Sequence, residues 1–262
     1  MSHALEDWVG PQALQQLDPQ AVALLCFPFA GGAASVFRGW RERAAAHVQP
    51  LPVQLPGREQ RWDEAPYTEL STLVQTLVSV LSPLLRPPFA LFGHSMGAFI
   101  AFELARELRR LNRPGPVRLF VSACRAPHIP DPHPSLSGLP QAEFVARLQR
   151  LNGVSEEVVR NHDMIEFLTP MLRADFRMCD TYVYRPGRPL DCPISAFAGI
   201  DDTYTRRSHL AMWRRYTRAA FVERSLPGNH LFLMSATAAI RDAIAADLAS
   251  PYLSGERYHE RG

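Results

Sequence analysis

This chain contains, in order, a serine, an acidic pair and a histidine, the side chains that can together make a serine hydroxyl nucleophilic. Ser95 lies in the motif Gly93-His-Ser-Met-Gly97, the acidic pair Asp201 and Asp202 comes later, and His230 follows both. A serine attacks a carbonyl carbon when an imidazole takes its proton and a carboxylate holds that imidazole in the useful tautomer. The residues therefore predict acyl-transfer chemistry, with Ser95 as nucleophile and His230 as base.

The segment around Ser95 predicts a sharp strand-to-helix turn. An apolar run begins at Phe89, reaches the G-x-S-x-G motif, and continues into a helical pattern that ends near Leu111. This order is typical of a nucleophile elbow, in which flanking glycines let strand and helix pass closely and the serine sits at strained backbone angles. The alternative is an ordinary tight turn, because five loosely defined positions also recur by chance.

The acid and the base follow two late predicted strands. Asp201 and Asp202 come directly after Ile194–Ile200, and His230 comes shortly after Phe221–Leu226. Nucleophile, acid and histidine follow the same chain order in α/β-hydrolases, with acid and base on loops after late strands. Asp202 is favoured as the acid because it lies three residues past Gly199. Asp201 stays open as the alternative, and Asp131 is a more distant candidate.

The first predicted strand, Ala21–Phe27, ends in a glycine-rich turn that contains Phe29. In α/β-hydrolases a turn after an early strand supplies one amide of the oxyanion hole, and the residue after the nucleophile supplies the other. We therefore expect the amides of Phe29 and Met96 to stabilise an oxyanion, although without Ser95 the turn would be read as a plain loop. A helix is predicted from this turn to about His47.

The remaining periodicity alternates between strands and helices, which predicts a mostly parallel, doubly wound sheet and, with the motifs above, an α/β-hydrolase fold. Pro50 and Pro52 remove amide donors from one strand, which suits a sheet edge or a short strand. The further predicted strands are Val48–Leu55 and Val117–Ala123, and the further predicted helices are Tyr67–Leu85, Arg206–Arg218 and Ser235–Leu248.

Residues 127–182 interrupt this alternation, and we expect them to form a linker and a helical lid inserted into a single domain of residues 1–262. The linker is rich in proline, and helical patterns follow it without an intervening strand. The large apolar side chains of these helices predict either an apolar pocket lining or ordinary packing on the sheet. The three patterns are Gln141–Leu151, Ser155–Arg160 and His162 to about Tyr182.

Composition excludes several other kinds of chemistry. All 28 basic residues are arginine, so lysine-dependent catalysis is absent, and the net charge of +2 argues against a nucleic-acid binder. The four cysteines and nine histidines show no metal-ligand spacing, so we expect neither a metal nor another cofactor. The sequence has no apolar run of membrane-spanning length and no signal pattern, so we expect a cytoplasmic protein. Arg58, isolated in a turn, is expected to be solvated rather than to bind an anionic ligand.

Nearly the whole chain, roughly residues 20 to 250, resembles the type II thioesterases that accompany polyketide synthases and nonribosomal peptide synthetases. The helical segments of residues 127–182 make the match specific, because many hydrolases share the elbow. One departure is Leu231, where the family usually has an aromatic residue after the histidine. The motifs are Cys26-Phe-Pro-Phe-Ala-Gly-Gly32, Leu55-Pro-Gly-Arg-Glu59, Phe92-Gly-His-Ser-Met-Gly-Ala98, Leu139-Pro-Gln-Ala-Glu-Phe144, Leu151-Asn-Gly-Val154 and Pro170-Met-Leu-Arg-Ala-Asp175.

The resemblance implies an editing thioesterase that removes stalled or aberrant acyl groups from the phosphopantetheine arm of acyl or peptidyl carrier proteins. It implies these carrier proteins as partners, and neither nucleic acid nor membrane. Two alternatives stay open. One is a carboxylester hydrolase that acts on free small esters with the same three side chains, and the other is a non-catalytic acyl-carrier-binding protein of the same fold.

Overall fold

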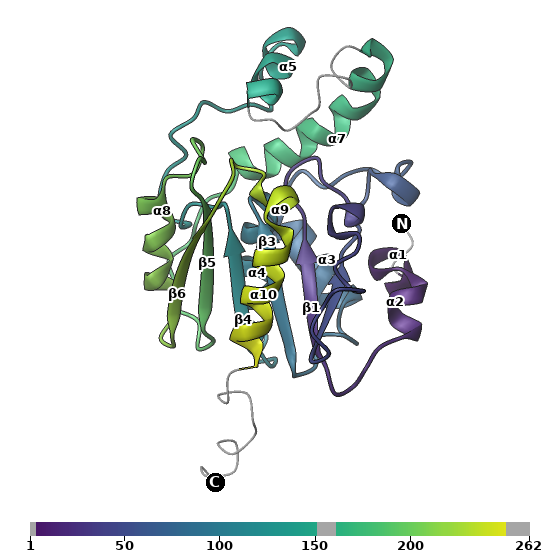
Figure 1. Ribbon diagram of the computed structural model, residues 1–262. Coiled ribbons are helices and arrows are strands. Elements are labelled where there is room, and N and C mark those ends of the chain that lie inside the picture. Colours follow the sequence, from purple (N-terminus) through teal and green to yellow (C-terminus); the bar gives the residue numbers. More distant parts are fainter. Residues whose placement is uncertain (1–3, 151–160, 250–262) are drawn as a thin grey trace.

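A parallel β-sheet forms the centre of the protein in a computed structural model, which describes residues 4–150 and 161–249 (Figure 1). Within these residues the sheet has six strands in the order β2-β1-β3-β4-β5-β6, and every neighbouring pair is parallel. The predicted mostly parallel sheet is therefore confirmed, and the proline-containing strand β2 lies at its edge. The strands are β1 (Val22–Phe27), β2 (Val48–Pro52), β3 (Phe89–His94), β4 (Arg118–Ser122), β5 (Ile194–Gly199) and β6 (Phe221–Leu226).

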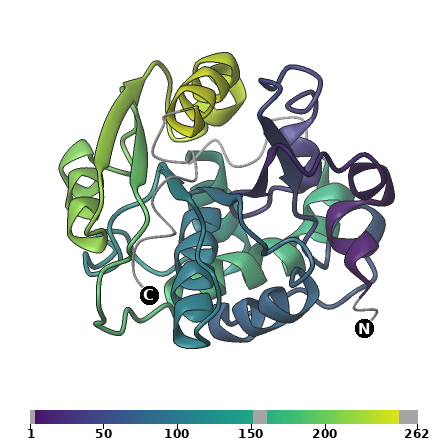
Figure 2. The same ribbon diagram turned by 90° about the horizontal axis from the view of Figure 1, so that it is seen from below.

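Helices cover both faces of this sheet (Figure 2). Successive side chains of a strand point to opposite faces, and in β1 Leu25 joins the core beneath α3 and α4 whereas Leu24 joins the core beneath α10. Burial on both faces explains why the strands read as continuous apolar runs. The helices are α1 (Leu5–Val9), α2 (Pro11–Gln15), α3 (Leu70–Val80), α4 (Met96–Arg110), α5 (Gln141–Arg150), α7 (His162–Asp180), α8 (Arg207–Ala211), α9 (Phe232–Ser235) and α10 (Thr237–Leu248).

The register of the strands brings their carboxyl ends to one edge of the sheet. Gly93 pairs with Phe27 of β1, and the next residue, His94, pairs with Ser122 of β4. On the other side of β4, Gly199 at the end of β5 pairs with Leu226 at the end of β6. The segments that follow β1, β3, β5 and β6 therefore leave the sheet close together, as ligand-binding loops of open α/β sheets do.

The turn between β3 and α4 has the predicted strain and close packing. Ser95 adopts φ 55° and ψ −117°, a backbone conformation that L-residues rarely occupy. A Cβ atom on Gly93 would overlap the backbone of Gly97, and one on Gly97 would overlap the carbonyl groups of Phe27 and Pro28. Both positions therefore require glycine, and the N-terminus of α4 lies directly against the turn that follows β1.

Residues 127–182, which we call the inserted segment, lie between β4 and β5 and carry α5 and α7. Figure 1 shows these helices at the top of the molecule, beyond one edge of the sheet. Many of their apolar side chains form a small core of their own. The predicted helix Ser155–Arg160 lies outside the described residues. The core consists of Leu136, Phe144, Leu148, Met171 and Leu172.

Two helix predictions were wrong in extent. The stretch after the first turn contains only a 3₁₀ turn at Ala34–Phe37, and Gly39 follows with a φ of 75°, which no right-handed helix accommodates. The helix predicted over Arg206–Arg218 divides into α8 and a 3₁₀ helix at Met212–Tyr216. In both places the apolar spacing marks buried residues but does not determine the helix type.

Candidate active site

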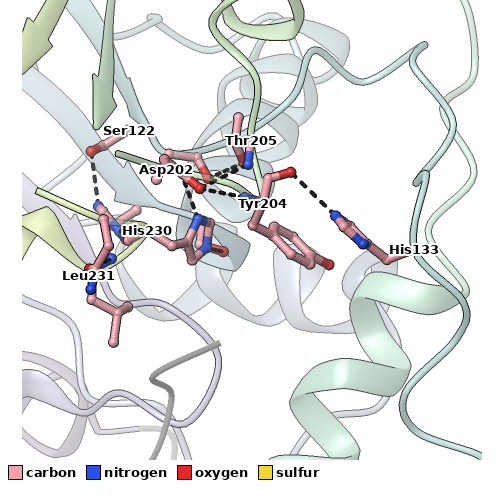
Figure 3. A network of polar contacts seen from close by, with 11 residues as sticks. Ser122, His133, Asp202, Tyr204, Thr205, His230 and Leu231 are labelled. Atoms are coloured by element: carbon pink, nitrogen blue, oxygen red, sulfur yellow. Dashed lines mark hydrogen bonds and ion pairs between the residues drawn. The ribbon is translucent and has the colours of Figure 1, made fainter. Parts of the chain in front are cut away.

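The structure brings Ser95, His230 and Asp202 into one chain of hydrogen bonds. His230 Nε2 lies 3.0 Å from Ser95 Oγ, and His230 Nδ1 lies 2.9 Å from Asp202 Oδ2. A carboxylate only accepts, so Nδ1 carries the proton and donates it to Asp202, which leaves Nε2 to accept from the serine hydroxyl. Figure 3 shows Asp202 and His230 side by side. Ser95 is thus hydrogen-bonded to the nitrogen that can take its proton.

Asp202, and neither of the two other candidate acids, contacts His230. Its Oδ1 accepts hydrogen bonds from the amides of Tyr204 and Thr205 at 2.8 and 2.9 Å. Burial raises the pKa of Asp202, but the hydrogen bond from His230 and the two amides outweigh burial, so the net pKa lies below its usual value. Asp202 is therefore ionised at neutral pH, as an orienting acid must be.

The other two acids lie elsewhere. Asp201 is exposed to solvent, and its backbone amide donates to the carbonyl of Gly228. Asp131 forms an ion pair with Arg125 at 3.0 Å and accepts a hydrogen bond from the Tyr204 hydroxyl. Residue spacing favoured Asp202 over Asp201, and of the three candidate acids only Asp202 contacts His230 in the described residues.

The two amides expected at the oxyanion hole lie on adjoining segments. Met96 is the first residue of α4, so its amide has no carbonyl partner within the helix. Phe29 belongs to the turn after β1, which is closed by a 2.8 Å hydrogen bond from the Gly32 amide to the Phe29 carbonyl. Gly97 holds these two segments in contact. Among the described residues, neither the Phe29 nor the Met96 amide has a protein acceptor.

His94, the residue before Ser95, holds the backbone of His230 in place. Its Nε2 donates to the His230 carbonyl oxygen at 2.8 Å, and its Nδ1 accepts from the Ser122 hydroxyl at 2.9 Å. The side chain is fully buried, and burial followed by the nearby His230 lowers its pKa to about 3. The sequence signal for this supporting contact was the position of His94 at the end of an apolar run.

An aromatic pair from the inserted segment and the acid loop flanks the base (Figure 3). His133 stacks on Tyr204 with ring centroids 4.2 Å apart, and the Tyr204 and His230 rings make an edge-type contact with centroids 5.0 Å apart. Nothing in the spacing of these residues predicted the contact, because it joins two loops that lie 71 residues apart in sequence.

Arg58 is buried, which contradicts the expectation that it is solvated. Its guanidinium group forms two hydrogen bonds to the carboxylate of Asp175, at 2.8 and 2.9 Å. The prediction failed because the partner lies on α7, 117 residues further along the chain.

In the described ranges, no group of three or more histidine, cysteine or acidic side chains has an arrangement that could hold a metal ion. No helix there is long and apolar enough to cross a membrane.

A serine, a histidine and an acid placed after β3, β6 and β5 of a parallel sheet define the α/β-hydrolase class of serine hydrolases. Comparison with known proteins narrows the class. The family model for the thioesterase domain matches residues 22–248. The chain therefore belongs to the thioesterase family, which confirms the resemblance found in its sequence.

Individual relatives cover most of the chain. The linear gramicidin dehydrogenase LgrE of Brevibacillus parabrevis is 41% identical over 90% of this chain and 90% of its own length. RedJ, a thioesterase from the prodiginine pathway of Streptomyces coelicolor, is 38% identical with a TM-score of 0.82, over 88% of this chain and 87% of its own. YbtT, a type II thioesterase from the yersiniabactin NRPS/PKS pathway, is 29% identical with a TM-score of 0.79, over 88% of this chain and 94% of its own. The name of LgrE denotes a dehydrogenase, whereas the family model and both structures denote thioesterases.

The buried neutral state of His94 leads to a test of stability against pH. Between about pH 7.5 and pH 5, an unfolded histidine gains a proton near pH 6.5, whereas His94 in the folded protein does not. The free energy of unfolding should therefore decrease as the pH is lowered from about 7.5 to 5, and His94 should account for about 2 kcal/mol of this decrease. In His94→Gln the decrease should be smaller by that amount. Urea unfolding of both proteins at the two pH values measures it.

All other titrating groups are common to the two proteins. The difference between their pH-dependent losses of unfolding free energy therefore reports on His94 alone. Equal losses of stability in the wild type and in His94→Gln would show that His94 is protonated in the folded state.

Proposed function

We propose that this protein hydrolyses acyl thioesters through an acyl-serine intermediate, with Ser95 as nucleophile, His230 as base and Asp202 as the orienting acid. The observation that carries the proposal is the continuous chain of hydrogen bonds from Ser95 Oγ through the His230 ring to the Asp202 carboxylate. Each group has the donor or acceptor role that the chemistry needs.

In the first half-reaction Ser95 Oγ attacks the thioester carbonyl carbon while His230 Nε2 takes the hydroxyl proton. Negative charge then develops on the carbonyl oxygen, and the amides of Phe29 and Met96 stabilise it. Removing one such donor typically raises the barrier by about 3 kcal/mol. The imidazolium formed on His230 is stabilised by Asp202 and returns the proton to the departing thiolate.

In the second half-reaction a water molecule attacks the acyl-serine. His230 takes a proton from this water, the same two amides stabilise the second oxyanion, and the proton passes to Ser95 Oγ as the free acid leaves. The fixed positions of Asp202 and of the His230 backbone mean that the imidazole serves both steps without reorientation.

We propose that the thioester is carried on the phosphopantetheine arm of an acyl or peptidyl carrier protein, and that the enzyme removes stalled or aberrant acyl groups during polyketide or nonribosomal peptide synthesis. Support comes from the similarity to YbtT, which belongs to an NRPS/PKS pathway, and to RedJ, which belongs to the prodiginine pathway. In this proposal residues 127–182 act as a lid on a single hydrolase domain. The cytoplasmic location stays a prediction.

The assignment of the acid can be tested with two neighbouring residues. Asp202→Asn should lower kcat about 10³- to 10⁴-fold, because the amide cannot hold His230 in the tautomer that accepts from Ser95. Asp201→Asn is the matched control, because this exposed side chain does not contact His230, and it should change kcat less than about twofold. Steady-state hydrolysis of a small acyl thioester measures both. A large loss in Asp201→Asn with an active Asp202→Asn would reverse the assignment.

The substrate class can be tested by comparing an acyl carrier protein with a simple alkyl ester of the same acid. We expect kcat/KM to be at least about tenfold higher for the acyl carrier protein, since binding of the arm and carrier adds interactions that the ester lacks. Ser95→Ala should abolish turnover of both substrates.

Faster hydrolysis of the ester would favour a carboxylester hydrolase instead. Carrier binding without turnover in the wild-type protein would favour a non-catalytic carrier-binding role, and full activity in Ser95→Ala would contradict the mechanism.

A further inference from the structure

A buried carboxylate on α7, Asp175, is bonded directly to the turn that carries the Phe29 amide. Its Oδ2 accepts a 2.7 Å hydrogen bond from the Gly31 backbone amide, and the carboxylate is also held by both terminal nitrogens of Arg58. The side chain of Asp175 is fully buried and that of Arg58 nearly so. A charged group from the inserted segment thus ends two residues from the expected oxyanion donor.

Arg58 extends the same network along the turn. Its Nη1 also donates to the Gly32 carbonyl oxygen at 3.0 Å, and its own carbonyl accepts from the Gln54 side chain at 2.8 Å. Gln54 in turn accepts a 2.7 Å hydrogen bond from the Ala34 amide. Successive backbone groups of the turn are therefore fixed by three side chains, and only one of these, Asp175, comes from α7.

Packing adds a second contact between α7 and the turn. Gly31 has a φ of 83°, and a Cβ atom built on it would lie 2.5 Å from Leu172 Cδ2. Leu172 lies one helical turn before Asp175, so the same face of α7 presses on Gly31 and bonds its amide. Because the Gly32 amide donates to the Phe29 carbonyl, movement of Gly31 would also move Phe29.

We propose that Asp175 and Arg58 are positioning residues of the oxyanion hole, and that through them α7 sets the direction of the Phe29 amide. This inference rests on the proposed function, in which Phe29 stabilises the oxyanion. Oxyanion donors act only when they are aimed at the position that the charged oxygen occupies in the transition state. Loosening the turn should therefore lower kcat and leave KM nearly unchanged.

The protein contains a second buried aspartate that provides a matched control. Asp247 on α10 forms two hydrogen bonds to Arg224 at 2.6 and 2.8 Å and accepts one from Ser195 at 2.6 Å. Ser195 is the second residue of β5, near the amino end of the strand and away from the edge where Asp202 lies. Asp247→Asn thus disturbs an ion pair with the same two-bond geometry, between a buried aspartate and a partly buried arginine, without touching the proposed active site.

The test compares Asp175→Asn with Asp247→Asn. Steady-state kinetics with a small acyl thioester should give Asp175→Asn a kcat about 10- to 100-fold below the wild type, with KM changed less than about threefold. Inhibition by a trifluoromethyl ketone, which forms an anionic tetrahedral adduct with an active-site serine, should weaken by a similar factor. Inhibition by an uncharged thioether analogue should not change. In Asp247→Asn all these quantities should stay within about twofold of the wild type.

Thermal unfolding of each variant shows whether the protein is folded. If Asp175→Asn does not fold, the double variant Arg58→Gln/Asp175→Asn replaces it in the test, because it leaves no unpaired buried charge. We expect the same loss of kcat and of ketone inhibition in the double variant. An unchanged kcat in the folded variant, an effect on KM alone, or an equal loss in Asp247→Asn would overturn the inference. Absence of wild-type turnover, or activity in Ser95→Ala, would instead overturn the proposed function on which it rests.

Discussion

The close approach of the β1 turn to the N-terminus of α4 is the constraint on which the active site depends. Gly97 lies against the carbonyl groups of Phe27 and Pro28, and any side chain at that position would separate the two segments. Because of this contact, the Phe29 amide and the Met96 amide belong to adjoining segments. The strained φ of Ser95 is a consequence of the same turn. Backbone packing thus places Ser95, which we propose as the nucleophile, next to the two amides that we propose as oxyanion donors.

Polar contacts hold His230, which we propose as the base. His230 is fixed at its ring by Asp202 and at its backbone carbonyl by His94. Asp202 is itself held by two amides, and His94 by Ser122. Both ring nitrogens of His230 and of His94, and both carboxylate oxygens of Asp202, have hydrogen-bond partners. A polar network that is satisfied in this way is rigid. The neutral state of His94 also keeps a second positive charge away from the imidazolium that forms on His230.

The sequence was sufficient to predict the parallel sheet and the strained turn between β3 and α4, because these follow from local patterns. Continuous apolar runs reveal strands buried on both faces, and glycines reveal close backbone approach. Asp202 could be favoured over Asp201 by spacing alone, but only the hydrogen bond to His230 distinguishes them in space.

The features that could not be predicted are those that join distant parts of the chain. Arg58 was taken for a solvated residue because its partner, Asp175, is 117 residues away. The stacking of His133 on Tyr204 likewise joins two loops that have no common local pattern. Such contacts depend on how the inserted segment lies over the sheet, and no periodicity of one segment carries that information.

These contacts also change the interpretation of the inserted segment. Its helices were expected to cover the site, yet Leu172 and Asp175 on α7 contact the turn that carries Phe29. The described part of this segment therefore contributes to the framework of the active site as well as to its surroundings. Any movement of α7 would act on the turn that carries Phe29 through the direct hydrogen bond from the Gly31 amide to Asp175.

The central claim is that Ser95 is an activated nucleophile, and covalent labelling tests it most directly. After treatment of the wild-type protein with a fluorophosphonate, mass spectrometry of the intact chain and of its peptides should show one adduct, located on Ser95. The phosphonate oxygen would occupy the place of the oxyanion, so labelling requires both the base and the donors. A protein that stays unlabelled, or that is labelled at another serine, would contradict this account.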